Sequence, residues 1–403
     1  MSKVFVSELN RTPLERQRIE ICERKGLGHP DYICDSVMNE VSIALSKEYV
    51  KKFESILHHN IDKGMLVAGE AKVRFGGGKI EKPMLLIFGD RATISVGEAH
   101  LDIEGIAIKA AKNWFRHNLR FVDPEKHLNF QVELKPGAEE LRDIFKRGGR
   151  FLGANDTSAA VGYAPMTKTE KAVLAMERFL NSKSFKKNYP ETGEDVKVMG
   201  LRNGDHLQFT IAMSFVDRYI GSEAEYFRKK SEVIEEMRSF AESKVPFKSE
   251  IHLNTLDKRG RGVNGVYLTV LGTSAEAGDS GQVGRGNRVN GIIPLNRPTS
   301  SEAAAGKNPV SHVGKIYNVL TYYLADAIYE RVPGIEEIYV WLLSQIGQPI
   351  NRPKIAAAQV VPSNKGAFHE IAKKVEETLD AELENKKLEQ FCKKLAEGQL
   401  PIC

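Results

Sequence analysis

The sequence has few cysteines and no long apolar run. Its 403 residues include only four cysteines, and none of them forms a CxxC pair or has the spacing of a zinc site. No apolar stretch is long enough to span a bilayer, and the first segment lacks the apolar core of a signal peptide. These features predict a reduced, cytoplasmic protein that does not act at a membrane.

Two common nucleotide-binding motifs are also missing. The residues Gly306-Lys307-Asn308 do not belong to a GxxxxGK[ST] phosphate loop, and no GxGxxG sequence follows an expected strand. If the chain binds phosphate, the site must therefore be of another type.

The basic residues gather in a segment that is poor in aromatic residues. Residues 279–315 contain five basic and two acidic side chains, and so carry +3 of the net charge of +5. Nucleic-acid bases commonly stack on aromatic side chains, so this composition argues against a nucleic-acid partner. Glycine combined with arginine and lysine suits a small, highly charged anion instead.

Strand pairs followed by long amphipathic helices occur three times along the chain, which predicts the α+β class with layered sheets and helices. The segments share no obvious sequence identity. We place approximate domain boundaries near residues 140 and 265, giving ranges 1–140, 141–265 and 266–403 that need not be continuous. The expected strand pairs are 65–75 with 82–96, 194–201 with 206–216, and 335–347 with 354–362; the expected helices are 101–119, 222–245 and 367–397.

The segment GLGHPDYICD, residues 26–35, predicts a helix start with unusual polar residues. Pro30 suits the first helical position, and Asp31 and Asp35 lie one turn apart, opposite an apolar stripe. A helix N-terminus attracts phosphate, and a magnesium ion could reconcile phosphate with the two carboxylates. Helix capping by His29 and stabilisation of the helix dipole by the aspartates would explain the same residues without a ligand.

A second helix start, AAAGKNPVSHVGK, carries positive charges instead. Asn308 can cap this helix and Pro309 can begin it, which would place His312 and Lys315 in the first turns. Positive charges are disfavoured at a helix N-terminus unless an anion binds there. The alternative is a pair of surface lysines.

A third segment, GANDTS at residues 153–158, is a polar loop ahead of a helix that Thr167 can cap. Spacing alone favours a simple loop and cap for this segment.

Taken together, GHPDYICD, GANDTS, DSGQVGRGNR and AAAGKNPVSHVGK resemble the S-adenosylmethionine synthetases, specifically their archaeal form, over nearly the whole chain. The resemblance implies three similar domains around a pseudo-threefold axis. It also implies attack of the methionine sulfur on C5′ of ATP, followed by cleavage of the released triphosphate to pyrophosphate and phosphate. Members require Mg²⁺, for which we expect two ions, and K⁺ often assists. They form homodimers or dimers of dimers with active sites at the subunit interface.

The resemblance assigns site residues by motif. Four of them, His29, Lys197, Arg285 and Lys307, are expected to take part in catalysis. The implied contacts of ATP and its phosphates are His29, Gly153, Ala154, Asn155, Asp156, Thr157, Ser158, Asp195, Lys197, Arg285, Arg288, Lys307 and Lys315. Those of methionine are Glu70, Asp156 and Asp279, and the implied metal ligands are Asp31, Asp279 and Asp35.

The chain departs from the bacterial pattern at several of these motifs. Tyr32 replaces a lysine, Gly286 replaces a second lysine for which Arg288 can supply the charge, and Asn308 replaces an aspartate. No carboxylate lies between Val310 and Lys315, so the second magnesium ligand stays open between Asp35 and Asp279.

Two other functions compete with this interpretation. A phosphotransferase could use the same basic loop and magnesium ligands, and it would release ADP or AMP. A non-catalytic polyanion-binding protein needs a basic face without acidic metal ligands, and Asp31, Asp35 and Asp279 argue against it.

Overall fold

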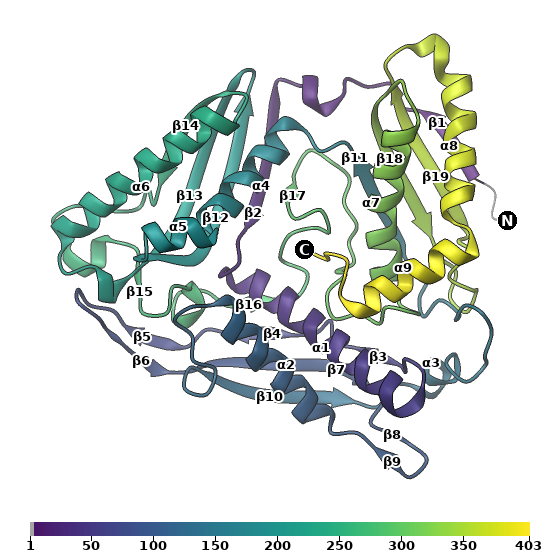
Figure 1. The fold of residues 1–403 in the computed structure, drawn as a ribbon, viewed down its shortest axis with the longest axis horizontal. Coiled ribbons are helices and arrows are strands. Elements are labelled where there is room, and N and C mark those ends of the chain that lie inside the picture. The colour runs from purple at the N-terminus through teal and green to yellow at the C-terminus, as the bar shows by residue number, and fades with distance from the viewer. Residues whose placement is uncertain (1–3) are drawn as a thin grey trace.

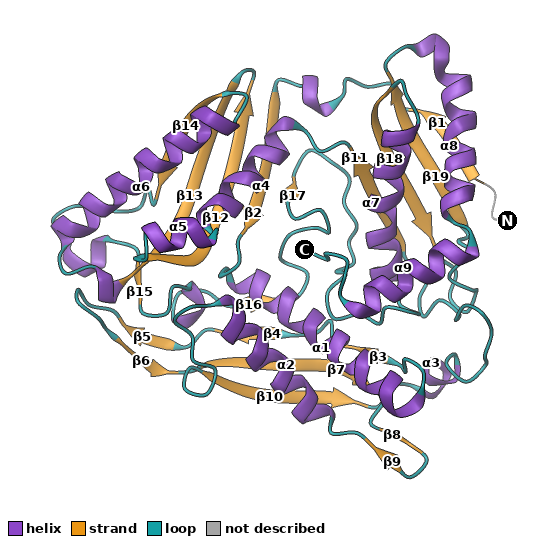
Figure 2. Cartoon of the chain, viewed as in Figure 1, coloured by secondary structure: helices purple, strands orange, loops and turns teal. Residues whose placement is uncertain are grey.

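Three mixed β-sheets, each with helices packed on one face, make up the computed structural model, which describes residues 4–403 (Figures 1 and 2). Each sheet and its helices enclose a separate apolar core. The predicted α+β fold of three similar units is confirmed. No helix among the described residues is both long enough and apolar enough to cross a bilayer.

The arrangement of elements repeats three times: a first helix, two antiparallel strands, a second helix, and a strand that pairs in parallel with the second of the two. In the first unit these are α1 (Pro30–Phe53), β4 (Met65–Val67), β7 (Met84–Ala92), α2 (Ile103–Asn118) and β10 (Leu128–Lys135). In the second they are α4 (Lys168–Leu180), β12 (Thr192–Asn203), β13 (His206–Val216), α6 (Glu223–Lys244) and β14 (Lys248–Leu253). The third has α7 (Val313–Arg331), β18 (Ile335–Leu343), β19 (Ile355–Pro362), α8 (Phe368–Glu382) and, from the other end of the chain, β1 (Val4–Glu8).

Each sheet is completed by a fourth strand that the units exchange in a cycle. The strand before α1, β2 (Ile19–Lys25), joins the sheet of the second unit, and the strand before α4, β11 (Ala159–Ala164), joins that of the third. β16 (Gly281–Gln282), which precedes α7 with one short strand between them, joins that of the first. This cyclic exchange has the pseudo-threefold symmetry that the sequence resemblance implied. Because β2, β11 and β16 each join the sheet of another unit, the units are not continuous in sequence, and the domain boundaries proposed near residues 140 and 265 stay a prediction.

The remaining elements extend the three sheets or cover their edges. β3 (His59–Asn60) pairs with β7, β15 (Leu268–Thr269) with β13, and β17 (Ile293–Pro294) with β2. Two small hairpins join β5 (Glu70–Lys72) to β6 (Lys79–Lys82) and β8 (Ser95–Val96) to β9 (Ala99–His100). The short helices are α3 (Glu139–Asp143), α5 (Lys183–Asn188) and the C-terminal α9 (Asn385–Glu397).

Most of the predicted elements are present, with two differences. The hairpin of β12 and β13 turns at Asn203-Gly204, where Gly204 adopts a φ of 63° that favours glycine. Both strands expected in the first unit are divided. The one over 65–75 becomes β4 and β5, because the chain leaves the first sheet after Val67 to form a separate hairpin with residues 79–82. The one over 82–96 becomes β7 and β8, because residues 95–96 pair with β9 instead. The expected helical tail is likewise divided, between Glu382 and Asn385.

Candidate functional site

The start of α1 carries a buried, neutral histidine. His29 is the N-cap, and its Nδ1 accepts a hydrogen bond from the backbone N of Asp31 at 3.2 Å, while Pro30 begins the helix as predicted. Burial lowers the pKa of His29 to about 4, although Asp31 lies nearby. Since Nδ1 acts as the acceptor, we assign the proton to Nε2, which can donate to a ligand beyond the helix start.

Asp31 is held on both sides rather than facing an open cleft. Its Oδ2 accepts a hydrogen bond from Lys25 Nζ at 2.8 Å, and its Oδ1 accepts one from the backbone N of Gln282 at 3.0 Å. Lys25 Nζ also donates to the carbonyl oxygen of Arg285 at 2.6 Å. Sequence reasoning missed Lys25, although this residue directly precedes the GLGHPD motif. Lys25 brings a cation to the point where phosphate was expected.

Asp35 lies one turn further along α1 and is more deeply enclosed. Its Oδ1 accepts a hydrogen bond from the backbone N of Gly284 at 2.8 Å, and a Cβ at Gly286 would come within 2.2 Å of its Oδ2. Burial raises the pKa of Asp35 to about 7, and Asp31 adds to the effect while Arg288 opposes it. The expectation that Asp35 would point into a cleft is therefore wrong, because residues 281–286 pack over this face of α1.

Strand β12 brings the predicted pair Asp195 and Lys197 beside the same helix start. The backbone N of Gly28 donates to the carbonyl of Glu194 at 2.9 Å, and Lys197 Nζ lies 3.5 Å from Glu23 Oε1. Asp195 Oδ2 accepts hydrogen bonds from Ser274, at 2.8 Å from its N and 2.5 Å from its Oγ. Burial raises the pKa of Asp195 to about 6, even though these donors oppose the shift.

A cavity of about 700 Å³ opens beside Lys197 on β12. Its other lining residues include Met199, Asn254 and Tyr267, and the hydroxyl of Tyr267 donates to Asp195 Oδ2 at 3.4 Å. Sequence reasoning did not identify Tyr267. The volume lies within the range of small-molecule sites. Of the α1 cluster, which comprises Lys25, His29, Asp31, Asp35, Asp195 and Lys197, the residue that lines this cavity is Lys197.

The start of α7 repeats the histidine cap of α1. The helix begins at Val313, and His312 Nδ1 accepts a hydrogen bond from the backbone N of Gly314 at 3.1 Å. Burial lowers the pKa of His312, and Lys307 lowers it further. The prediction that Asn308 caps this helix and Pro309 begins it is wrong: Asn308 accepts from the backbone N of Val310 and Ser311, and so closes a turn ahead of the helix.

The two lysines beside α7 are buried and already have partners. Lys307 Nζ lies 2.6 Å from Asp62 Oδ2 and 3.0 Å from Glu302 Oε2. Lys315 Nζ donates to Asn39 Oδ1 at 2.8 Å, and burial, with Lys307 adding to it, lowers the pKa of Lys315 to about 7. The lysines are therefore not the exposed surface pair of the alternative interpretation.

The loop of residues 153–158 lies against this second helix start. Asn155 Oδ1 accepts a hydrogen bond from the backbone N of Val313 at 3.3 Å, and the backbone N of Asn155 donates to Ser311. Thr157 Oγ1 accepts from the backbone N of Ile346 at 2.9 Å. The loop, which spacing alone left as a simple connection, thus joins the cluster around Lys307.

A polar cavity of about 270 Å³ lies beside this cluster, lined in part by His58, Asn60, Asp90 and Ser311. His58 Nδ1, Asn60 Oδ1 and Ser311 Oγ are buried atoms without a hydrogen-bond partner. Burial raises the pKa of Asp90 to about 6, and the adjacent Asp62 adds to the shift. Buried polar atoms are usually satisfied, so these three indicate room for a polar ligand. Asp90 also has a φ of 107°, which is unusual for a residue other than glycine.

Two predicted residues lie outside these contacts: Glu70 is exposed on β5 and pairs with Lys82, and Asp279 is exposed on the segment that crosses the start of α1. Arg285 joins the α1 contacts only through its carbonyl oxygen, and its side chain is exposed. No hydrogen bond or ion pair between described residues links the α1 cluster to the α7 cluster. Over residues 4–403, no three His, Cys, Asp or Glu side chains are grouped so that they could hold a metal ion.

Comparisons with known proteins agree with the resemblance found in the sequence. The family model of S-adenosylmethionine synthetase (AdoMet synthetase) matches residues 2–399. The chain is 44% identical over 400 residues to S-adenosylmethionine synthase of Methanothermobacter thermautotrophicus, covering 99% of each chain. It is 46% identical over 384 residues to that of Pyrococcus furiosus, covering 95% of each.

A solved structure described as an unusual S-adenosylmethionine synthetase from Campylobacter jejuni has a similar fold. Its TM-score is 0.56 at 14% identity, over 94% of this chain and 100% of that one. At this identity the match supports the fold alone. The family model and the near-complete alignments with archaeal relatives carry the assignment: the chain belongs to the S-adenosylmethionine synthetase family.

Proposed function

We propose that the chain makes S-adenosylmethionine from ATP and L-methionine by attack of the methionine sulfur on C5′ of ATP, and then cleaves the released triphosphate to pyrophosphate and phosphate. Membership of the family carries this proposal. The thioether sulfur is already nucleophilic, so the reaction needs no general base. The main demand is to align the reactants and to stabilise negative charge on the departing triphosphate.

The start of α1 suits that demand. A neutral His29 can donate from Nε2 to a phosphate oxygen, the positive end of the helix dipole favours an anion, and Lys25 and Lys197 add positive charge nearby. Arg285 and Arg288 extend the positive charge along the adjoining segment. We assign the triphosphate to this cluster and the nucleoside to the cavity beside Lys197 and Tyr267.

The residues of this cluster also fit magnesium. Asp31 and Asp35 offer hard oxygen atoms at the helix start, and Mg²⁺ commonly uses one or two carboxylates together with substrate phosphates. The ion would neutralise charge on the triphosphate. Lys25 would then move from Asp31 toward the phosphates. Asp31 is the principal proposed ligand, with Asp35 and the exposed Asp279 as the others.

We further propose a homodimer in which the α1 cluster of one subunit meets the α7 cluster of its partner. No hydrogen bond or ion pair between described residues joins the two clusters within one chain, yet the family resemblance assigns residues of both to one reaction. Each sheet also leaves apolar residues uncovered on the face away from its helices: Met65 opposite Ile87, Ile21 opposite Leu201, and Leu343 opposite Ile355. Packing such faces together is a usual basis of a stable dimer.

Incubation with ATP, methionine and Mg²⁺ tests the reaction directly. We expect S-adenosylmethionine, pyrophosphate and phosphate in equal amounts, measured by liquid chromatography and mass spectrometry, and none of these products in amount when methionine is omitted. ADP or AMP as the product would support a phosphotransferase instead. Hydrolysis of ATP at the same rate with and without methionine would sink the proposal.

Mixing two inactive variants tests the shared site. His29→Asn alters the α1 cluster and Asp156→Asn alters the loop beside α7. If each site takes both clusters from different subunits, remixed dimers should regain about a quarter of wild-type activity, because half of them are mixed and hold one intact site of two. Two separately purified variants that stay inactive after subunit exchange, confirmed by mass, would contradict the shared site.

A further inference from the structure

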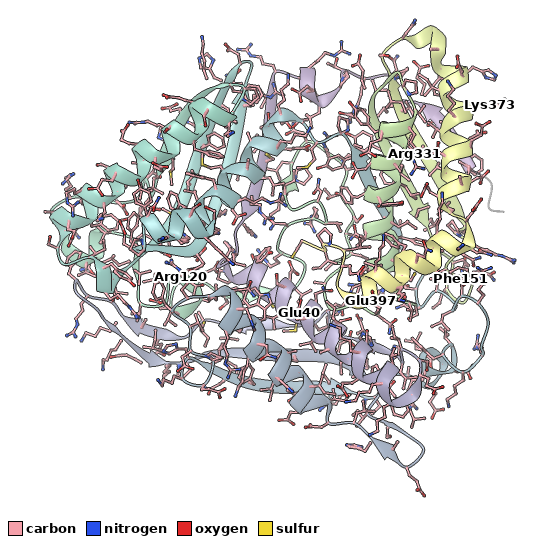
Figure 3. The ribbon with its side chains drawn as sticks, viewed as in Figure 1. Glu40, Arg120, Phe151, Arg331, Lys373 and Glu397 are labelled. Atoms are coloured by element: carbon pink, nitrogen blue, oxygen red, sulfur yellow. The ribbon has the colours of Figure 1, made fainter. Side chains whose placement is uncertain are left out.

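A third cavity lies outside both clusters, between the last turns of α1, helix α9 and the segment Arg150–Leu152. It has a volume of about 590 Å³, within the range of small-molecule sites. Phe151 and Glu397, which both line it, are labelled beside α9 in Figure 3. None of the residues assigned to ATP, methionine or magnesium lines this cavity.

The floor of the cavity is apolar. It is formed mainly by Val50, Ile56, Leu152, Val310, Ile350 and Ala396. Cys392 also belongs to it, and burial raises the pKa of its thiol to about 12, so this side chain behaves as an apolar group. Val50 on α1 is 48% exposed at the mouth. Such a surface favours a ligand with an apolar body.

The rim of the cavity carries excess positive charge. Four basic and two acidic side chains line it, and both acids have basic neighbours: Glu389 bonds to Arg150 at 2.6 Å, and Glu397 lies 3.9 Å from Lys393. The side chains of Lys47 and Lys51 form no hydrogen bond or ion pair with any residue that the structure describes. They stand one turn apart on α1, where like charges repel.

We propose that this cavity binds an organic anion with an apolar tail, a medium-chain fatty carboxylate being the simplest member of the class. The tail would lie on the floor, and the carboxylate would lie between Lys47 and Lys51. The charge complementarity of an unpaired lysine pair above an apolar floor selects this chemistry over an uncharged or cationic ligand. The site is a concave cavity, so it suits a small ligand better than a flat protein surface.

The position of the cavity connects it to the proposed active site. The backbone N of Ile350 donates to the carbonyl of Leu152 at 3.1 Å, and the backbone N of Ala154 donates to Gln348 at 2.7 Å. Leu152 therefore continues directly into the loop whose Asn155 contacts the start of α7. A ligand on the floor would hold this loop from behind, and so would change its mobility.

Calorimetric titration of the intact protein with octanoate, decanoate and laurate, below their micelle concentrations, tests the binding. Each added methylene should tighten the Kd by about fourfold, since burying one contributes about 0.8 kcal/mol. Lys47→Glu combined with Lys51→Glu should weaken laurate binding roughly tenfold or more. Lys52→Glu on the same helix is the matched control, because Lys52 does not line the cavity; it should change the Kd less than twofold.

Several results would overturn the proposal. These are no saturable binding, equal affinity for dodecanol, or equal weakening by the Lys52→Glu control. Sedimentation of the protein with phosphatidylserine vesicles, without binding of monomeric laurate, would assign the surface to a membrane instead. None of these readouts depends on catalysis, so they stand apart from any failure of the proposed reaction.

Hydrogen exchange tests the connection to the loop. Laurate should slow amide exchange across residues 150–158 severalfold in the wild-type protein, and the Lys47→Glu/Lys51→Glu variant should show no change. Binding without altered exchange in this segment would refute the connection, although the site itself would remain.

Discussion

The three units begin their first helices at equivalent places, yet only two of these starts keep polar groups available for a ligand. α1 is capped by His29 and α7 by His312, each through Nδ1, and cavities lie beside both clusters. α4 is capped by Thr167 in a capping box with Glu170, and Glu170 is held by Arg297 at 2.7 Å. The guanidinium of Arg297 also stacks on the ring of Tyr163.

This difference shows that the same fold can use one helix start to bind a ligand and another only to stabilise the protein. A histidine cap uses one ring nitrogen for the helix and leaves the other for a ligand. In a capping box, the side chains of Thr167 and Glu170 both bond to backbone N–H groups at the start of the helix. Arg297 then pairs with the carboxylate of Glu170. The start of α4 is therefore occupied by the protein itself, and we expect it to contribute stability rather than catalysis.

The largest expected effect concerns the sealed start of α4. Arg297→Met leaves the fully buried Glu170 without its cation, and should lower the free energy of unfolding by about 3–5 kcal/mol. Urea denaturation followed by circular dichroism measures this. Adding Glu170→Gln should restore part of the loss, because both charges are then gone. A single variant as stable as wild type would mean that the α4 start does not depend on this pair.

The next effect distinguishes the cap from the chemistry at α1. Asparagine is also a good N-cap, so His29→Asn should preserve stability while lowering kcat about 10²–10³-fold through loss of a phosphate donor. His312→Asn should lower kcat less, because the cations near His312 are already paired. Steady-state kinetics with ATP and methionine checks both. The reverse order of the two effects would assign the main phosphate contact to α7.

The smallest effect contrasts the pH dependence of the two clusters. The pKa of Asp195 is raised in the folded protein, so the folded state keeps this proton up to a higher pH than the unfolded chain does. The free energy of unfolding should therefore fall by about 1–3 kcal/mol as the pH rises from 4 to 6. The pKa of Lys315 is lowered in the folded protein, so the folded state loses this proton at a lower pH than the unfolded chain does. The free energy of unfolding should therefore increase as the pH rises from about 7 to about 10.

Urea titrations across these ranges measure the two slopes. Asp195→Asn should make only the acidic slope shallower, and Lys315→Met only the basic one; the raised pKa values of Asp35 and Asp90 and the lowered pKa of Lys186 keep part of each slope in both variants. If either variant alters both slopes, the two clusters are coupled within one chain, and the separation described here fails.

The sequence predicted the local features of the fold well and the long-range ones poorly. Pro30, Thr167 and Gly204 act on their immediate neighbours, so the helix starts at residues 30 and 168 and the turn at 204 could be predicted. The start of α7 could not, because Asn308 also bonds to Leu57 and His59, far away in the chain. The exchange of strands among the sheets has no local signature at all.

The same distinction applies to the site. The resemblance selected residues by motif, and the structure brings many of them to the starts of α1 and α7. Lys25, Tyr267 and Asp62 lie in no motif quoted for the family, and their contacts come from strands and loops distant in the sequence. The burial of Asp35 likewise depends on residues 281–286, which only the folded chain places over α1.

The pairing of β1 with β19 has a consequence for how the protein is made. Val4 lies opposite Ala356, so β1 needs a partner translated about 350 residues later. At about 5–20 residues per second, β1 waits roughly 20–70 s as a nascent segment without its sheet. The sheet of the third unit therefore closes only after β19 has been translated, and β1 stays an unpaired strand until then.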